Sequence, residues 1–504
     1  MSRLVVRTTT DAAGLAEILE PRTDLLLERA LGDGRFEAAD GPVEFYLRIV
    51  ETADGPRPGD VLVTQTIDFR LGVPYFGWLF RWPFKRALAR PARGQAPWWA
   101  PPARLDARAA SVLGTLALLT VAFGYLNTLF TQTVTFAGDE FGSSNEALGI
   151  AGSLVRVGGL VALFVVVQAD RRGRKAMLVL SATAGSLLAV TGAAAPSLAW
   201  LTASQLLARA FATAILILVA IVAAEEMPAG SRAYAVSLLA MAGGLGAGIC
   251  VIALRLADLG VRGWRVLYVL PVLALPVVGA VRRRLPESRR YVARHPDAAL
   301  GGHGGRLVLL AVSGLLSNLF SAPNSQFSNQ FLRTERGFSG GRIALLSLTA
   351  GTPGSIGIVV GGRMADVRGR RRVAAGALVF GTLLTVAFFF ARGWAMWAFA
   401  TVGTILGAAA IPALGVYGPE LFPTGLRGRA NGLVAVSSLV GSGAGLVLAG
   451  VLSQRIGRIG PAMAIVAAGP LLLAMLVLAA YPETAGRELE DLNPEDRPGP
   501  APTP

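Results

Sequence analysis

From Ala109 onward the chain alternates between long apolar runs and short polar connections. The runs contain about 20 residues each, which as helices span a hydrocarbon core of about 30 Å. They are too long for soluble strands, so the pattern predicts transmembrane helices. We expect twelve, near residues 110–136, 147–168, 176–196, 199–224, 233–257, 264–281, 307–331, 343–362, 373–391, 394–418, 430–452 and 460–481.

Residues 1–105 show a different pattern. Val43–Thr52 and Asp60–Leu71 alternate apolar and polar residues with the period of two that is typical of strands. The breaker-rich stretch ADGPRPG between them predicts a hairpin. In the first segment, this alternation places three apolar residues on one face of the strand, namely Phe45, Leu47 and Ile49.

Helical patterns flank this predicted hairpin. Asp11–Ala30 predicts a helix broken at Pro21, because proline cannot continue the hydrogen-bond ladder. Pro74–Arg90 (PYFGWLFRWPFKRALAR) mixes aromatic residues with cations. Such a mixture is typical of a membrane-interfacial segment, and it equally fits the last helix of a small domain. We therefore expect a small α+β domain and leave both readings of its final segment open.

Composition and charge favour a membrane protein. Of the 504 residues 53% are hydrophobic and 16% charged, a balance that cannot cover several soluble cores. The net charge of +15 is compatible with nucleic-acid binding. Here, however, the Lys and Arg residues lie between the apolar runs, where a membrane protein keeps them. We expect a lipid bilayer as partner and no nucleic acid.

Residues for metal, thiol or catalytic chemistry are scarce. The single cysteine, Cys250, lies in an apolar run, and both histidines, His295 and His303, fall in one polar loop. No nucleophile and base pair, multi-histidine site or phosphate-binding loop of the G-x-x-x-x-G-K-[ST] type can be assembled. We expect no metal, no cofactor and no enzymatic activity.

The distribution of Lys and Arg predicts the orientation. Connections after the even-numbered spans carry 19 of these residues, against 9 in the other connections. By the positive-inside rule the even-numbered connections, both termini and the N-terminal domain are cytoplasmic. We expect a multi-pass protein of the cell (plasma) membrane.

Three motifs occur twice in the same order. DRRGRK begins at Asp170 and DVRGRR at Asp366; E-x-x-P-x-x-x-R covers Glu225–Arg232 and later Glu420–Arg427. A third box reads PES at residue 286 and PET at residue 482. The offset is 195 or 196 residues in every case. A constant offset predicts two related halves.

With these motifs the chain resembles the major facilitator superfamily over residues 106–490, most closely its sugar porter and metabolite:proton symporter branches. The resemblance implies an all-α membrane protein of two six-helix bundles, with a midplane substrate site and alternating access. The expected parts are a soluble α+β domain with an interfacial segment (1–105), an N-terminal bundle (106–281), a cytoplasmic loop (282–306), a C-terminal bundle (307–481) and a disordered tail (482–504).

The chain departs from the family pattern at several positions. Val166 stands where the first copy of the signature G-x-x-x-D-[RK]-x-G-[RK]-[RK] begins with glycine, and Val367 replaces the first basic residue of the second copy. The seventh span lacks the sugar porters' Q-Q-x-x-G-x-N, and the first span lacks the aspartate of many proton-coupled members. These departures weaken the prediction of a sugar substrate and the prediction of proton coupling.

The residues of the repeated boxes could form a latch, by which we mean a set of contacts that closes the cytoplasmic side in one state and breaks in the other. An aspartate at the end of a span can accept from the N-terminus of a facing helix, and arginines after a glycine turn can pair with glutamate. The alternative is that these loops only supply topogenic charge. The predicted gating residues are Asp170, Arg171, Gly173, Arg174, Glu225, Arg232, Gly362, Asp366, Gly369, Arg370, Glu420 and Arg427.

Polar stripes in the first and seventh spans are the candidate substrate contacts. Tyr125, Thr128 and Gln132 share one helical face, and the offset of 196 maps this stripe onto the seventh span. The alternative is that these groups bond only to neighbouring helices or backbone. The corresponding residues of the seventh span, with one added a turn before them, are Asn318, Ser321, Asn324 and Ser328.

Arg209 is the remaining candidate for substrate binding. It lies about ten residues, or roughly 15 Å, into the fourth span, where an unpaired charge is expensive. No acidic residue falls clearly in the middle of any span. An electropositive cavity centre suits an anion, although Arg209 could instead pack on helix carbonyls.

These observations predict a secondary transporter for a small polar or anionic organic solute, with protons as a candidate coupling ion. The alternative is a transporter-like sensor or an exporter that acts through the N-terminal domain. Deleting residues 1–100 separates the two, because a transporter keeps its solute flux and a sensor loses its output.

Overall fold

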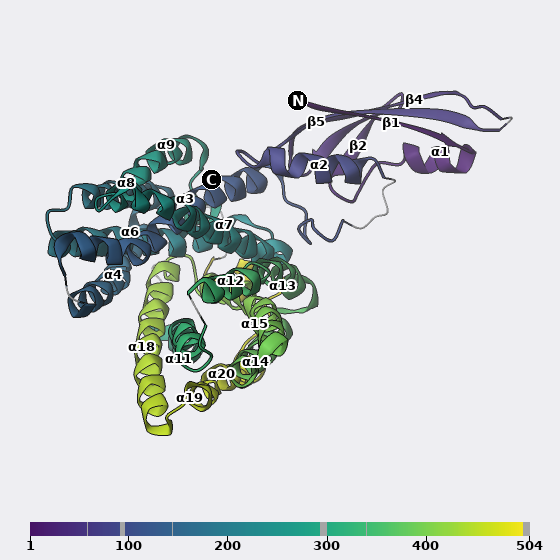
Figure 1. Ribbon diagram of the computed structural model, residues 1–504. Coiled ribbons are helices and arrows are strands. Elements are labelled where there is room, and N and C mark those ends of the chain that lie inside the picture. The colour runs from purple at the N-terminus through teal and green to yellow at the C-terminus, as the bar shows by residue number, and fades with distance from the viewer. Residues whose placement is uncertain (58, 91–95, 144, 293–299, 339, 497–504) are drawn as a thin grey trace. The chain divides into compact units, whose positions relative to one another are not determined.

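The computed structural model describes residues 1–57, 59–90, 96–143, 145–292, 300–338 and 340–496 (Figure 1). His295 and the proline-rich residues 497–504 lie outside the described residues. The chain forms two compact units, Met1–Leu118 and Leu119–Pro504.

The first unit contains a five-stranded antiparallel sheet in the order β1-β5-β4-β3-β2, with two helices (Figure 1). The α+β class and the β4–β5 hairpin are as predicted. The elements are β1 (Ser2–Thr10), α1 (Ala12–Leu19), β2 (Leu27–Gly32), β3 (Arg35–Asp40), β4 (Val43–Asp54), β5 (Val61–Leu71) and α2 (Gly77–Leu88).

Both helices pack on one face of the sheet. Phe45, Leu47 and Ile49 share one face of β4, but the opposite face turns to the core, because Phe45 is 40% exposed and Tyr46 and Val50 are buried. Tyr46 donates to Glu28 of β2 over 2.6 Å, and Arg48 lies 2.6 Å from the same carboxylate. A satisfied buried ion pair thus lies on the core side of β4, where apolar periodicity cannot reveal it.

The predicted helix over Asp11–Ala30 is correct only in its first half. α1 ends at Leu19, and its C-cap Glu20 is already extended, as expected for the residue before Pro21. The second half forms β2, which turns into β3 through Asp33 and Gly34 at positive φ. That tight turn makes a hairpin where the apolar pattern alone favoured a helix.

Twelve helical segments in the described part of the chain are long and apolar enough to cross a membrane, which confirms the predicted number. In the N-terminal half they are α3 (Ala107–Phe141), α4 (Asn145–Arg172), α5 (Arg174–Thr191), α6 (Leu198–Glu226), α7 (Arg232–Ala253) and the pair α8 (Trp264–Val269) and α9 (Ala274–Arg284).

In the C-terminal half several spans are broken into consecutive helices. They are α11 (Gly304–Thr334), α12 (Gly340–Gly351) with α13 (Gly354–Arg368), α14 (Arg370–Phe390), α15 (Gly393–Ala408) with α16 (Ala410–Gly415) and α17 (Tyr417–Glu420), α18 (Arg427–Ile456), and α19 (Ile459–Val466) with α20 (Ala468–Ala480). Short helices α10 (Arg289–Val292) and α21 (Leu489–Leu492) lie in the connections.

Two of the helix crossings between the halves, α7 with α13 and α4 with α18, each use a small residue. A Cβ on Gly362 of α13 would lie 2.8 Å from the carbonyl oxygen of Ala233 in α7. At the equivalent crossing, a Cβ on Gly428 of α18 would lie 2.8 Å from the carbonyl oxygen of Val166 in α4. At the α4–α18 crossing Val166 takes the place of the motif glycine, but Gly428 on the facing helix leaves the same room. The two helix backbones therefore approach closely at both crossings.

Close packing also holds the C-terminal half together, and it can be tested at Gly357. A Cβ there would lie 1.8 Å from the carbonyl oxygen of Ile405, which is backbone and cannot rotate away. We predict that Gly357→Ala lowers the free energy of unfolding by about 1–3 kcal/mol through overpacking. The measurement is the thermal unfolding midpoint in detergent.

The matched control is Gly376→Ala in α14, where a Cβ meets nothing within 4 Å. Both variants gain the same helix propensity, so only the packing differs. Equal midpoints for the two variants would contradict the close approach at Gly357.

Candidate functional site

Two buried aspartates cap helices of the opposite half. Asp170, at the end of α4, accepts from the N–H groups of residues 428 and 429 at 3.3 and 3.2 Å. Asp366, at the end of α13, accepts from those of residues 233 and 234 at 3.3 and 2.9 Å. A carboxylate satisfies the unpaired N–H groups of a helix start and complements its dipole. Each aspartate therefore holds one half against the other.

A first cluster of charges surrounds Glu225 at the end of α6. Arg427 of the opposite half donates to Glu225 over 2.9 Å, and Arg174 lies 3.5 Å from the same carboxylate. Arg174 also lies 3.1 Å from Asp170, and Arg427 lies 2.8 Å from Asp496. These side chains are at most 3% exposed. Two guanidinium groups thus share three carboxylates away from water.

A second cluster surrounds Glu420 at the end of α17 and follows the sequence repeat. Arg370 donates to Glu420 and lies 3.0 Å from Asp366. Arg232 of the opposite half lies 3.4 Å from Glu420 and 3.2 Å from Glu488. The two halves are therefore joined twice, by equivalent residues, on the side where the motif boxes lie. We call this side the motif side.

The structure brings most of the predicted gating residues together on the motif side. Gly362 lies at the α7–α13 crossing described above. Arg171 is exposed, and its carbonyl oxygen accepts from the hydroxyl of Tyr291 over 2.9 Å. The gating role of these residues stays a prediction, since the geometry is that of one closed state.

Sequence reasoning missed two glutamates that shape this site. Gly173 and Gly369 both have φ of +99°, a conformation that favours glycine, and each precedes a helix. The first N–H groups of α5 and α14 donate to Glu287 and Glu483, each over 2.9 Å. These glutamates belong to the PES and PET boxes. Their repetition at the common offset was the signal of an equivalent role.

The acidic part of the tail is structured through residue 496, in contrast to the predicted disorder. Asn493 donates to the carbonyl oxygen of Glu420 over 2.7 Å. Burial is the largest single influence on Glu490 and disfavours its charged form. Hydrogen bonds, including one from Arg290, and the charges of Arg290 and Arg232 together hold the pKa of that carboxyl below its usual value. The tail is ordered because its carboxylates meet arginines of the motif side.

The predicted stripe in the first span is largely occupied by contacts within its own half. Tyr125 is 7% exposed and donates to the carbonyl oxygen of Leu267 over 2.8 Å. Thr128 donates to the carbonyl oxygen of Gly124 over 3.0 Å, and Gln132 is half-buried. Contact of this stripe with a substrate stays a prediction.

The matching stripe in α11 faces a cavity inside the C-terminal half. Asn318, Ser321 and Asn324 line this cavity, whose volume is about 680 Å³. Ser328, one turn further on, donates to the carbonyl oxygen of Asn324 over 2.6 Å. Other polar residues of the lining are Ser313, Ser317, Thr382, Thr385, Thr404, Asn431 and Tyr481.

Arg209 is half-buried in α6 and donates to the carbonyl oxygen of Asn127 over 2.5 Å. A second arginine, Arg156 of α4, lies near enough for its charge to act on Arg209. Sequence reasoning missed Arg156, although a cation inside the apolar run GSLVRVGGLV was a visible signal. Both cations lie within spans of the N-terminal half.

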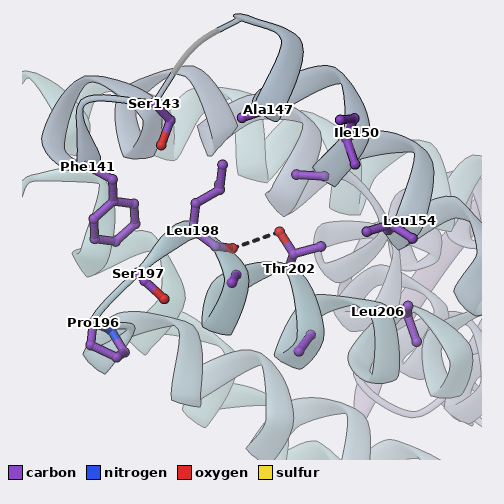
Figure 2. Close-up of a pocket in the computed structure, with 13 residues that line it drawn as sticks. Phe141, Ser143, Ala147, Ile150, Leu154, Pro196, Ser197, Leu198, Thr202 and Leu206 are labelled. Atoms are coloured by element: carbon purple, nitrogen blue, oxygen red, sulfur yellow. Dashed lines mark hydrogen bonds between the residues drawn. The ribbon is translucent and has the colours of Figure 1, made fainter.

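A separate hollow of about 730 Å³ lies between the ends of α3, α4 and α6 (Figure 2). None of the 13 residues drawn in Figure 2 is charged, and Leu198, Leu154 and Leu206 are typical of them. The hydroxyl of Thr202 is bonded to its own helix, at the carbonyl oxygen of Leu198. Such a lining suits apolar groups rather than an ion.

Comparison with known families gives one extended match. Residues 116–300 and 308–503 match the family described as the Major Facilitator Superfamily. Among curated proteins, none matches the chain significantly.

Solved structures share the fold at low sequence identity. The proton:xylose symporter XylE bound to 6-bromo-6-deoxy-D-glucose is 17% identical, with a TM-score of 0.66 over 76% of this chain and 98% of that chain. The human organic anion transporter MFSD10 is 15% identical, with a TM-score of 0.61 over 73% and 98%. FucP in the outward conformation is 14% identical, with a TM-score of 0.61 over 73% and 97%.

The latch hypothesis predicts that Asp366→Asn opens the motif side. The substitution removes a charge that accepts two backbone hydrogen bonds and pairs with Arg370. Hydrogen bonds to a charged group contribute about 1.5–3 kcal/mol, so the open population should rise about tenfold or more. The measurement is the rate at which a thiol reagent labels Ser237→Cys, which is buried at the α7–α13 crossing.

The matched control is Asp139→Asn, which changes an exposed aspartate near the C-terminal end of α3, outside the two charge clusters. Native Cys250 is buried and should contribute a constant background. Similar labelling rates in the Asp366→Asn and Asp139→Asn proteins would contradict the latch.

Proposed function

Because this chain belongs to the major facilitator superfamily of secondary transporters, we propose that it moves an anionic organic solute by alternating access, with Arg209 contacting the anion. The observation that carries the proposal is the environment of Arg209. It lies eleven residues after α6 begins at Leu198, and its hydrogen bond in the described structure is to a carbonyl oxygen. A charged arginine inside a span is costly unless an anion or water compensates it. A transported carboxylate would supply that charge.

Arg156 supports an aqueous route to Arg209. It lies six residues after the span Ile150–Arg172 begins and is exposed. Leu163 and Asp170 follow at intervals of seven, so Arg156 shares the α4 face that meets α18. An arginine on that face would be excluded from lipid, and would draw an anion from the open side toward the deeper Arg209.

The C-terminal half offers neutral groups for the rest of the solute. Asn318, Ser321 and Asn324 can donate to or accept from hydroxyl and carbonyl groups. A cation in one half and uncharged polar groups in the other favour a small solute with one anionic group and a polar body.

The membrane orientation belongs to the same proposal. The excess of Lys and Arg on the motif side favours a cytoplasmic location for that side and for both termini, in the cell membrane. With the motif side closed, the substrate route would face outward. Proton coupling has less support, because the first span lacks a carboxylate, although the printed name of XylE describes a proton symporter.

The test compares carboxylates with their amides in proteoliposomes. We predict that benzoate and succinate enter faster than benzamide and succinamide. Arg209→Gln should lower carboxylate uptake about tenfold or more, because a charge-assisted hydrogen bond contributes about 1.5–3 kcal/mol. Arg209→Lys should retain part of the uptake, since it keeps the charge but loses the bidentate geometry.

The matched control is Arg455→Gln, an exposed arginine at the end of α18. Equal rates for carboxylates and amides, or normal uptake by Arg209→Gln, would count against the anion site. An imposed proton gradient separates symport from uniport. Deleting residues 1–100 tests the sensor alternative, since a transporter keeps its flux.

A further inference from the structure

The helix α2 of the N-terminal unit is apolar on two opposite faces. Phe84 and Leu88 point into the core, where Phe84 contacts Phe69 with ring centroids 5.2 Å apart. Trp78 and Trp82 are 70% and 66% exposed. Exposed Leu79 shares their side of α2, because residues 78, 79 and 82 fall on one face of a helix. Tyr75, also exposed, precedes α2 at a positive φ and lines one hollow with Trp78. We call Tyr75, Trp78, Leu79 and Trp82 the aromatic face.

Cations border the aromatic face. Arg81 and Arg86 are exposed, and the guanidinium of Arg86 lies 5.3 Å from the ring centroid of Trp82. Arg81 and Arg70 also line a hollow of about 260 Å³ beside Trp78. Aromatic rings with adjacent guanidinium groups match the boundary layer of a bilayer, where apolar chains meet anionic headgroups.

The start of α2 lies beside the first membrane span. A Cβ on Gly114 of α3 would lie 3.0 Å from Cδ of Pro74, so α3 passes directly against the segment that enters α2. Gly114 is seven residues, or about 10 Å, beyond the start of the span at Ala107. The aromatic face begins one residue after Pro74. It is therefore tethered beside the first turns of that span.

We propose that the aromatic face binds the anionic phospholipid surface of the bilayer that the chain spans. Trp78, Leu79 and Trp82 enter the headgroup boundary, and Arg81 and Arg86 bind lipid phosphates. A second copy of this surface is a poorer occupant, because its cations would repel those of the first. The N-terminal domain is then held on the membrane by α2 as well as by its connection to α3.

The test places one reporter on the aromatic face of the full chain. Leu79→Cys, labelled with an environment-sensitive fluorophore, is reconstituted into nanodiscs that each hold one copy. One set contains phosphatidylcholine alone and the other includes phosphatidylglycerol, both with spin-labelled lipids as quenchers. Native Cys250 is buried, so the introduced thiol takes the label. We expect strong quenching at position 79 that increases with phosphatidylglycerol.

Two controls separate docking from general proximity. A label at Glu51→Cys, an exposed position on β4, should be quenched little in either lipid. Arg81→Gln and Arg86→Gln should each reduce the preference for phosphatidylglycerol about fivefold. Arg7→Gln, which removes an exposed arginine from β1, should leave the preference unchanged.

Quenching at position 79 no greater than at position 51 would overturn membrane docking. Equal quenching in the two lipid mixtures, or an equal effect of Arg7→Gln and Arg81→Gln, would overturn the role of anionic headgroups. The exposed substitutions are not expected to unfold the domain, and a circular dichroism spectrum of each variant verifies this.

Discussion

Four guanidinium groups lie fully buried where the two halves of the membrane unit meet. They belong to Arg174, Arg232, Arg370 and Arg427. A buried charge is tolerated only when carboxylates surround it, and removing one partner of such a pair costs about 3–5 kcal/mol. Glu225 and Arg427, like Glu420 and Arg232, come from opposite halves. Charge pairing thus joins the halves on the motif side in addition to apolar contact.

The motif-side contacts are symmetric, whereas the region proposed to bind the solute is not. Each half contributes an aspartate cap, a glycine turn and a glutamate, and these follow the repeat along the sequence. Away from the motif side, the N-terminal half carries Arg156 and Arg209, and the α11 side of the C-terminal half carries amides and hydroxyls such as those of Asn318 and Ser321. Duplicated contacts on the motif side are therefore combined with chemically different polar residues in the spans of the two halves.

The spans and the repeat could be predicted because hydropathy and motif spacing depend on the sequence alone and not on contacts made in the fold. The hydrogen bond of Tyr125 to Leu267 in its own half could not be predicted. Helical periodicity defines which residues share a face, but not which neighbour that face contacts. Which face of β4 turns inward could not be predicted for a related reason: the Arg48–Glu28 pair on the core side forms only in the folded domain. Asp496 was likewise missed, since a carboxylate in a polar tail resembles a solvated one until Arg427 lies beside it.

Burial separates two responses to ionic strength. Mobile ions screen charges that face water, with a Debye length of about 8 Å at physiological salt, and they hardly reach buried pairs. The Arg427–Glu225 pair is fully buried, while Arg81 and Arg86 are exposed. A rise in salt on the side of the N-terminal domain would thus weaken any attachment of α2 to anionic lipid and leave the motif-side pairs nearly unaffected. The same change in ionic strength would then act on the proposed lipid contact and hardly at all on the contacts between the halves.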